Sequence, residues 1–379
     1  MRNLSTLKGN PNNYAAIRLI VCTLSLSLLG LLMLYSASSY SAHLTYGDAF
    51  YFVKKQAIAL FIGVVCMFAL ANFKIEKLIK LRYPILIVSF VLLIIIFIPA
   101  VGVENYGAKR WINLGFMTMQ PSEVAKFGYV IFCAAYISKK GTHTFKNMLP
   151  VLLIGAAICV LLMLEPNMSI TICVGAVMLM LLFAGGAKAK HFATLFVPTA
   201  ALIPVMIIME PYRLQRIMAF IDPWAAPKAE GYQLIQSYYA LGSGGFFGVG
   251  LFNSRQKYLF LPFAESDFIF SIIGEELGFI GCVAVILVFL YMIYLGYSIA
   301  SKANSRYAAI LAFGITSIIA VQSVLNIAVV SGAVPPTGLP LPFLSYGGSS
   351  LVCFTSAIGI LLSICRHNCD TLVIKNHSM

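Results

Sequence analysis

The chain has 379 residues, of which 60% are hydrophobic and 10% are charged, and this composition excludes an ordinary soluble globular protein. The formal net charge of +13 does not indicate nucleic-acid binding, because the basic residues form short clusters between apolar segments, as topology signals do. We therefore expect a polytopic membrane protein built from helices, since the sequence lacks the long alternating segments of a transmembrane barrel.

Ten apolar segments, each close to the ~20 residues that cross ~30 Å of hydrocarbon, predict an all-α polytopic membrane protein with ten transmembrane helices. We interpret residues 1–379 as one membrane domain with cytoplasmic tails at 1–14 and 366–379. A large outer loop, 210–277, is expected between helices 7 and 8. The predicted helices cover residues 15–36, 56–72, 84–102, 123–138, 149–165, 167–186, 191–209, 278–297, 307–330 and 344–365.

The distribution of charge predicts the orientation of the chain. Most Lys and Arg residues lie at one set of helix ends, and the positive-inside rule places these ends and both termini in the cytoplasm. Among the 13 acidic residues, only Glu76 and Asp370 lie on this side. The outer face is therefore expected to carry mixed charge, which suits cations or polar sugars but is also typical of solvated loops.

The second outer connection leads into a predicted helix through the sequence QPSEVAK. Pro121 and Glu123 fit its first turn, where proline is tolerated and the helix dipole favours an anion. Lys126 follows three residues after Glu123, so both charges lie on one face. Two interpretations remain open: a self-neutralising pair that reaches the membrane interface, or a lysine that faces a polar cavity and serves a site.

The large outer loop combines prolines, glycines, aromatic residues and charges. After the basic residues Arg213 and Arg216, the sequence IDPWAAPKAEGYQ contains prolines that break regular structure. The next stretch, GYQLIQSYYALGSGGFFGVGLF, is too polar to cross lipid comfortably. We interpret it as a re-entrant or interfacial segment that protein or water covers.

Asp267 is a lone acid near the start of the eighth predicted helix. If that helix covers only residues 278–297, Asp267 and the pair Glu275 and Glu276 lie at or above the outer interface. If it begins at Phe268 instead, the two glutamates lie ~11 to 14 Å below Asp267, at 1.5 Å per residue. Either arrangement places an ionisable acid beside a gap lined by small residues, which in the second case are Ser271, Gly274 and Gly278.

The last outer connection, SGAVPPTGLPLPFLSYGGSS, carries no charge. Its prolines and paired glycines are expected to fix a rigid bend with exposed backbone amides, and Ser345 and its neighbours add hydroxyl groups. Such a segment can donate hydrogen bonds to an anion without a counter-charge. The alternative is a purely structural turn.

Three motifs together resemble the SEDS family (shape, elongation, division and sporulation), which includes FtsW, RodA and SpoVE. They occur in the family order and read NYGAKRWINLGFMTMQPSEVAK, GYQLIQSYYALGSGGFFGVGLFNSRQKYLFLPFAESDFIFSIIGEELGFIG and PPTGLPLPFLSYGGSS. With the ten predicted spans, the resemblance covers the whole chain. The proline-phenylalanine pair in the last motif and the SRQK sequence are more similar to the FtsW and SpoVE branch than to RodA.

The resemblance implies an inverting peptidoglycan glycosyltransferase that polymerises lipid II into glycan strands at the outer face of the bacterial cytoplasmic membrane. It implies Asp267 as the catalytic base that takes a proton from the acceptor sugar. A divalent cation, Mg²⁺ or Mn²⁺, could assist the leaving group beside these residues, whereas no nucleotide cofactor is expected because the donor is already activated. The resemblance also marks Arg110, Glu123 and Lys126 as site residues. The predicted substrate-binding residues are these three together with Arg255, Lys257, Ser345, Gly347 and Gly348.

The expected partners are lipid II, the growing glycan strand, membrane lipid, a class B penicillin-binding protein acting as transpeptidase, and other division proteins at the septum. A lipid II flippase and a non-catalytic division scaffold remain as alternatives, and the choice among division, sporulation and elongation stays open. The chain departs from the family pattern at Glu165, Asn167 and Phe263, so we assign these positions no role. Glu265 is expected to compensate locally for the missing glutamate at position 263.

Overall fold

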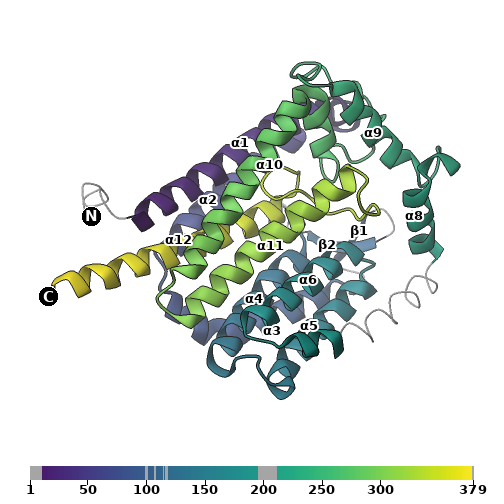
Figure 1. Ribbon diagram of the computed structural model, residues 1–379. Coiled ribbons are helices and arrows are strands. Elements are labelled where there is room, and N and C mark those ends of the chain that lie inside the picture. Colours follow the sequence, from purple (N-terminus) through teal and green to yellow (C-terminus); the bar gives the residue numbers. More distant parts are fainter. Residues whose placement is uncertain are drawn as a thin grey trace.

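The computed structural model is a bundle of long helices and describes residues 11–98, 101–105, 108–113, 115, 118–194 and 211–377 (Figure 1). Most of the described residues are helical, which confirms the predicted class in its main feature. The helices are α1 (Pro11–Tyr46), α2 (Tyr51–Ala71), α3 (Ile75–Ile95), α4 (Pro121–Lys140), α5 (Phe145–Leu164), α6 (Met168–Ala184), α8 (Pro211–Ile221), α9 (Tyr232–Gly244), α10 (Ile269–Ser301), α11 (Arg306–Val330) and α12 (Gly348–His377), with a 3₁₀ turn, η2 (Pro223–Ala225).

Seven helices in the described part of the chain are long and apolar enough to cross a membrane: α1, α2, α3, α5, α10, α11 and α12. Helix α6 is apolar but shorter, and α4 carries Glu123 and Lys126 in its first turns and two lysines in its last turn. The chain is therefore a multi-pass membrane protein. Most of the predicted seventh span, 191–209, lies outside the described residues, so the count of ten helices stays a prediction.

The boundaries of three predicted helices were wrong: α1 continues to Tyr46 rather than ending at residue 36, α3 begins at Ile75 rather than residue 84, and α12 continues to His377 rather than ending at residue 365. Helix α10 begins at Ile269, which agrees with the alternative start at Phe268 and not with the start at residue 278. The physical reason is that hydropathy detects the lipid-crossing part of a helix, whereas these helices extend beyond it through polar turns that protein contacts stabilise.

A three-stranded antiparallel sheet lies between α3 and α4, although the sequence predicted no strands. It consists of β1 (Gly102–Asn105), β2 (Ala108–Asn113) and β3 (Thr118–Met119), in the order β1-β2-β3. Ile112 of β2 pairs with Gly102 on one side and Met119 on the other. Strands this short carry too little alternation to be recognised in a sequence.

The bundle has two distinct ends (Figure 1). The sheet, α8 and α9 lie at one end, and the N-terminus and the end of α12 lie toward the other. Helix α4 is buried along most of its length and packs against both α3 and α11. This central position explains how α4 accommodates charged side chains in its first turns, because α11 rather than lipid surrounds them.

Helix α10 is broken at Gly278, whose φ of +68° lies outside the helical range. The break leaves the carbonyls of residues 275 and 276 without their helical donors, and the preceding loop supplies replacements: Val249 and Gly250 donate to them at 2.9 and 3.1 Å. In return, the amides of Phe279 and Ile280 donate to the carbonyls of residues 245 and 246. The backbone of the loop therefore completes the hydrogen bonding of the helix, as a low-dielectric environment requires.

Candidate active site

Asp267 lies in the turn that leads into α10, where three segments of the chain meet. Its backbone carbonyl accepts a hydrogen bond from Asn326 Nδ2 of α11 at 2.8 Å. Gly338, in the loop between α11 and α12, lies directly beside the carboxylate oxygen Oδ2. The side chain of Asp267 keeps partial contact with solvent, so the carboxylate is held by protein on several sides but remains accessible.

The pKa of Asp267 is set by burial and by charges from other elements. The surrounding protein raises this pKa to about 6; Arg216 lowers it, Glu265 raises it, and Arg110 lowers it to a smaller extent. With a pKa of about 6 the side chain is mostly ionised at pH 7, yet it can still hold a proton. This is the range that a general base requires.

Arg110 and Arg216 lie near Asp267 but belong to two different elements of the fold. Arg110 lies on β2, and its guanidinium donates to the carbonyl of Glu165 at 3.2 Å and to that of Pro166. Arg216 lies on α8 and donates to the carbonyl of Pro336 at 2.8 Å. The sheet and α8 thus each place one cation within electrostatic reach of Asp267.

Glu165 is a second unusual acid in this region, at the end of α5. Its side chain is 1% exposed, and neither carboxylate oxygen has a hydrogen-bond partner in the described part of the chain. Burial raises the pKa of Glu165 to about 8, although Arg110 opposes this shift. At pH 7 the side chain is therefore mostly the neutral acid, and the structure explains how it is tolerated but shows no role for it.

Glu123 and Lys126 form an ion pair inside the bundle. Lys126 Nζ lies 3.0 Å from Glu123 Oε1 and 2.5 Å from Gln322 Oε1 of α11, and it sits over the ring of Phe354. The two side chains are 0% and 1% exposed. The expectation that the pair shares a helix face is confirmed, but the interpretation as an interfacial pair was wrong because α11 and α12 cover it.

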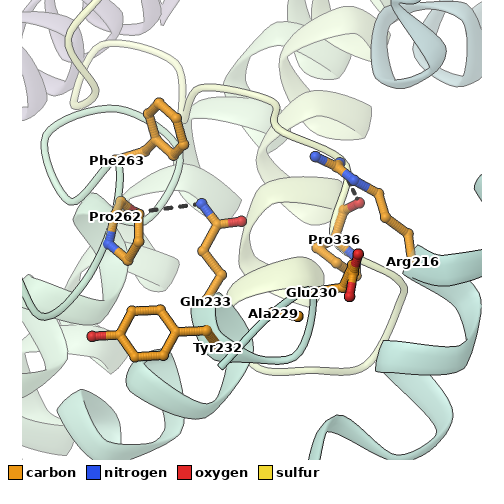
Figure 2. Close-up of a pocket in the computed structure, with 8 residues that line it drawn as sticks. All are labelled: Arg216, Ala229, Glu230, Tyr232, Gln233, Pro262, Phe263 and Pro336. Atoms are coloured by element: carbon orange, nitrogen blue, oxygen red, sulfur yellow. Dashed lines mark hydrogen bonds between the residues drawn. The ribbon is translucent and has the colours of Figure 1, made fainter. Parts of the chain in front are cut away.

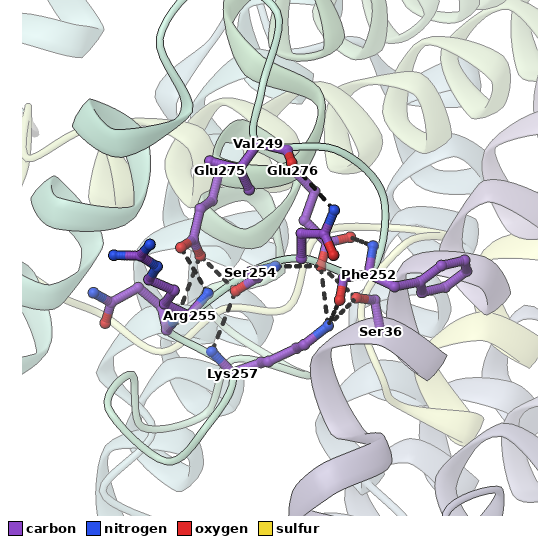
Figure 3. A network of polar contacts seen from close by, with 10 residues as sticks. Ser36, Val249, Phe252, Ser254, Arg255, Lys257, Glu275 and Glu276 are labelled. Atoms are coloured by element: carbon purple, nitrogen blue, oxygen red, sulfur yellow. Dashed lines mark hydrogen bonds and ion pairs between the residues drawn. The ribbon is translucent and has the colours of Figure 1, made fainter.

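Lys257 belongs to a separate buried network between the outer loop and α10 (Figure 3). Its ammonium contacts Glu276 Oε1 at 3.4 Å and Ser36 Oγ at 3.2 Å, and it donates to the carbonyl of Phe252. Arg255, in contrast, has an exposed side chain, while its backbone amide donates to Glu275 Oε1 at 2.8 Å. The two predicted ligands therefore differ in exposure: the side chain of Arg255 is exposed, whereas that of Lys257 is buried.

Two of the three predicted ligands in the connection between α11 and α12 are engaged within the protein. Ser345 Oγ donates to the carbonyl of Ser266 at 2.5 Å, and the amide of Gly347 donates to Gln56 Oε1 at 3.1 Å. The third, Gly348, begins α12. This segment lies next to Asp267, as the expected site requires, but the donors of Ser345 and Gly347 are directed at protein acceptors.

The predicted gap of small residues beside Asp267 is filled by α9. Ser271 Oγ hydrogen-bonds to Ser237 Oγ of α9 at 2.8 Å, and Gly274 packs against Leu241. The segment predicted as re-entrant or interfacial thus forms a regular helix, α9, followed by the loop that completes the break in α10.

Two cavities flank the segment that contains Pro262 and Phe263. The first, of ≈ 260 Å³, lies between this segment and α8 and α9, and Figure 2 shows Arg216 and Gln233 facing it from different sides. The second, of ≈ 350 Å³, lies toward the C-terminal end of α1 and is lined by hydroxyl groups, aromatic rings, Lys257 and Glu265. Phe263 lines both cavities.

The described residues do not fit a metal site made by the protein alone, since no three acidic, histidine or cysteine side chains among them converge as ligands. The two carboxyl groups nearest the site, Asp267 and Glu265, share it with Arg216 and Arg110. We therefore derive no catalytic step through a metal ion, and the predicted Mg²⁺ or Mn²⁺ stays a prediction.

Known proteins match this chain along nearly its whole length. The family model for FtsW, RodA and SpoVE, described as "Cell cycle protein", matches residues 17–370. The chain belongs to this family. Stage V sporulation protein E of Bacillus subtilis is 38% identical over 369 residues, covering 96% of this chain and 100% of that protein.

Further relatives of this member of the FtsW/RodA/SpoVE family carry names that state an activity. A probable peptidoglycan glycosyltransferase FtsW from Trichlorobacter lovleyi is 39% identical over 351 residues, or 91% of this chain and 92% of that protein. A solved chain from a study of "polymerization and crosslinking by a peptidoglycan synthase complex" has a TM-score of 0.77 and 27% identity, and covers 92% of this chain and 97% of that one. The crystal structure of RodA from Thermus thermophilus has a TM-score of 0.68 at 24% identity, with coverage of 92% and 96%, which shows the shared fold.

Several residues of the site were not singled out from the sequence. Arg216 was noted only as part of a basic stretch, and Gln322 and Asn326 were read as part of an apolar helix. A usable signal exists for the last two, because amides four residues apart in a membrane helix lie on one face and need internal partners.

Proposed function

We propose that this protein is a peptidoglycan glycosyltransferase that polymerises lipid II into glycan strands at the outer face of the bacterial cytoplasmic membrane, at the division septum. The single observation that carries this proposal is Asp267, a partly exposed carboxylate with a pKa of about 6 within electrostatic reach of Arg216 and Arg110. Two cavities flank the segment with Pro262 and Phe263 that precedes it in the chain. The names of the FtsW relatives support the same activity.

In the proposed reaction, Asp267 accepts the proton of the acceptor sugar hydroxyl. The hydroxyl oxygen forms a bond to the anomeric carbon of the donor, the bond from that carbon to the diphosphate breaks, and the lipid diphosphate leaves with the electron pair. The proton held by Asp267 then passes to solvent. Arg216 and Arg110 stabilise the negative charge that develops on the diphosphate, because cations placed in a partly dehydrated site act with little reorganisation.

The two cavities suit the two substrates in different ways. The cavity lined by Arg216 also contains Glu230, and we place the diphosphate of the donor on its arginine side. The cavity lined by Ser41, Thr45, Tyr46, Lys257 and Glu265 offers hydroxyl, aromatic and charged groups that suit a polar sugar, and we place the acceptor there. Asp267, close to both Arg216 and Glu265, is then positioned between donor and acceptor.

We also propose the finer topology that the sequence predicts: ten transmembrane helices, cytoplasmic termini, and residues 210–277 outside. The position of Lys139 and Lys140 at the far end of α4 from Glu123 supports this orientation. A class B penicillin-binding protein and other division proteins are the proposed partners, since the solved chain of similar fold comes from a complex that coordinates polymerization and crosslinking.

The deciding experiment incubates the purified protein, with and without its transpeptidase, with labelled lipid II and analyses the products for long glycan strands. The unaltered protein is expected to form them, and Asp267→Asn is expected to form none while retaining the elution profile and melting temperature of the parent. Glycan synthesis at a normal rate by Asp267→Asn would refute Asp267 as the base. Absence of product from the unaltered protein, even with its partner, would favour a scaffold or a flippase.

A further inference from the structure

We propose that Asn326 and the loop between α11 and α12 form a backbone clamp that positions Asp267, and that Asn326 and Ser345 are positioning residues that make no contact with substrate. This inference rests on the proposed function only in taking Asp267 as the base. In this proposal the uncharged proline- and glycine-rich motif positions Asp267, whereas the sequence predicted that it binds an anion.

The clamp consists of hydrogen bonds to three consecutive backbone carbonyls. The carbonyl of Glu265 accepts from the amide of Tyr346 at 2.9 Å, and that of Ser266 accepts from Ser345 Oγ at 2.5 Å. The carbonyl of Asp267 itself accepts from Asn326 Nδ2 at 2.8 Å. The segment that carries the carboxylate is thus fixed peptide by peptide.

The loop that provides the clamp is itself anchored to two helices. Asn326 Nδ2 also donates to the carbonyl of Leu339 at 2.5 Å, and Gln322 Nε2 donates to that of Pro340 at 2.9 Å. On the opposite side, Gln56 of α2 binds the loop twice, through the carbonyl of Ser345 and the amide of Gly347. Because the loop is bonded to both α11 and α2, the clamp fixes the position of Asp267 relative to these two helices.

The Glu123 and Lys126 ion pair joins the clamp through Gln322. Lys126 donates to Gln322 Oε1, which orients the amide so that its nitrogen faces Pro340. A buried ion pair of this kind gives little net stability, and its best-attested use is to fix one arrangement of a structure. The pair thus stabilises the orientation of the loop without reaching the cavities.

Gly338 shows how closely the loop approaches the reacting group. A Cβ atom at this position would lie 3.1 Å from Asp267 Oδ2, and the φ of Gly338 is +68°. Glycine is therefore required twice, for the left-handed backbone and for the space beside the carboxylate. A larger residue here would displace the atom that accepts the proton.

The hydrogen-bond donors of both positioning residues are already used. Ser345 has one hydroxyl hydrogen, which goes to Ser266, and its oxygen accepts from the amide of Leu341 at 2.8 Å. Asn326 directs its amide nitrogen to two carbonyls and is 1% exposed. Neither side chain retains a donor for a substrate anion, so both act through Asp267.

A positioning role predicts a specific kinetic signature. Small displacements of a catalytic group lower the rate of the chemical step by about 10²-fold, while substrate binding is little changed. Ser345→Ala and Asn326→Ala are therefore expected to lower kcat for glycan synthesis by about 10- to 100-fold, with KM for lipid II changed by less than about threefold. Ser345→Thr, which keeps the hydroxyl, is expected to retain more of kcat than Ser345→Ala.

The matched control is Ser363→Ala at the other end of α12. Ser363 is also a buried serine whose hydroxyl donates to a backbone carbonyl, that of Phe73 at 2.6 Å, but it lies far from Asp267 in the chain and in the fold. It is expected to share any loss of melting temperature seen in Ser345→Ala while keeping normal kcat. If Ser345→Ala does not fold, Asn326→Ala provides the same kinetic comparison with Ser363→Ala, because it removes the hydrogen bond to the carbonyl of Asp267 from a different helix.

Two results would overturn the clamp. A KM increase of tenfold or more at unchanged kcat would make Ser345 or Asn326 a substrate ligand, and normal kcat and KM would remove both from the mechanism. These results are distinguishable from failure of the proposed function, because Asp267→Asn would still be inactive in either case. If Asp267→Asn were active instead, the base assignment would fail whatever the clamp variants do.

Discussion

Two buried lysines, Lys126 and Lys257, each pair with a glutamate, but the two networks differ in how completely their oxygens are hydrogen-bonded. Both oxygens of Glu276 accept hydrogen bonds: Oε1 from Ser36 and from the amide of Ser254, and Oε2 from the amide of Phe252. In the other network, Glu123 Oε2 is buried and has no partner among the described residues. A buried ion pair whose oxygens are all hydrogen-bonded can be explained by its contribution to stability alone. A buried ion pair with an oxygen that lacks a hydrogen bond indicates a role beyond stability.

The location of the two networks supports this difference. Lys257 and Glu276 hold the loop to the first turns of α10, where they also organise the backbone (Figure 3). Lys126 and Glu123 act through Gln322 on the loop that contacts Asp267. The first pair therefore holds the loop to α10 beside the second cavity, which Lys257 also lines, and the second pair connects the centre of the bundle to the proposed base.

The largest expected effect concerns the fully satisfied network. Glu276→Ala leaves Lys257 as an uncompensated buried charge and removes the acceptor of two amides, so we expect a loss of about 3–5 kcal/mol in the free energy of unfolding. Thermal or denaturant unfolding in detergent measures it. Glu76→Ala, which removes an exposed carboxylate, is the control and should change stability by less than about 0.5 kcal/mol; equal effects of the two changes would contradict the comparison.

The second prediction separates stability from activity in the Lys126 network. Lys126→Met leaves the buried carboxylate of Glu123 unpaired and is expected to destabilise the protein by about 3 kcal/mol. The double variant with Glu123→Gln removes both charges and should recover most of that stability. We expect its glycan synthesis to stay at least about tenfold below normal because the link to Gln322 is lost. Full activity of the stable double variant would mean that this pair, too, is only structural.

A smaller effect is expected on the pH dependence of polymerisation. The base is active as the carboxylate, and the pKa of Asp267 is about 6, so kcat/KM should rise as pH increases through about 6. The positive charge of Arg216 lowers the pKa of Asp267, so Arg216→Ala should move the midpoint to higher pH. A pH–rate profile for Arg216→Ala, with the remote Arg18→Ala as control, tests the sign; an unchanged or lower midpoint would argue against Asp267 as the titrating group.

The smallest effect is expected for Arg255. Its side chain is exposed, so Arg255→Ala should change the free energy of unfolding by less than about 0.5 kcal/mol. If the side chain meets an anionic substrate, KM for lipid II should rise by about two- to fivefold, as for an exposed charge contact. Unfolding and steady-state kinetics measure the two quantities, and an unchanged KM would remove Arg255 from the substrate site.

The fold was predictable where one local signal dominates. Pro121 and Glu123 mark the start of α4, and the helix begins at Pro121 as expected. The start of α10 was ambiguous because Glu275 and Glu276 suggested a segment outside the bundle. Their partners lie in the loop some twenty residues earlier, and hydropathy has no access to such tertiary pairing.

The sequence indicated some of the residues that gather around Asp267 but not how they are connected. Resemblance drew attention to Asp267 and Ser345, and the structure places them in one region. It could not show that the hydroxyl of Ser345 is directed at the backbone of Ser266, or that α8 brings Arg216 toward Asp267. Such contacts join segments that are distant in the chain, and side-chain direction follows from packing rather than from local pattern.

The interruption of α10 at Gly278 has a consequence for how the protein is made. The peptide groups on both sides of this glycine find their partners in residues 245–250, which leave the ribosome before α10 does. A buried peptide group without a partner costs about 1–3 kcal/mol. The first turns of α10 therefore reach their final structure only when the earlier stretch has docked, and we expect the two segments to fold as one unit during biogenesis.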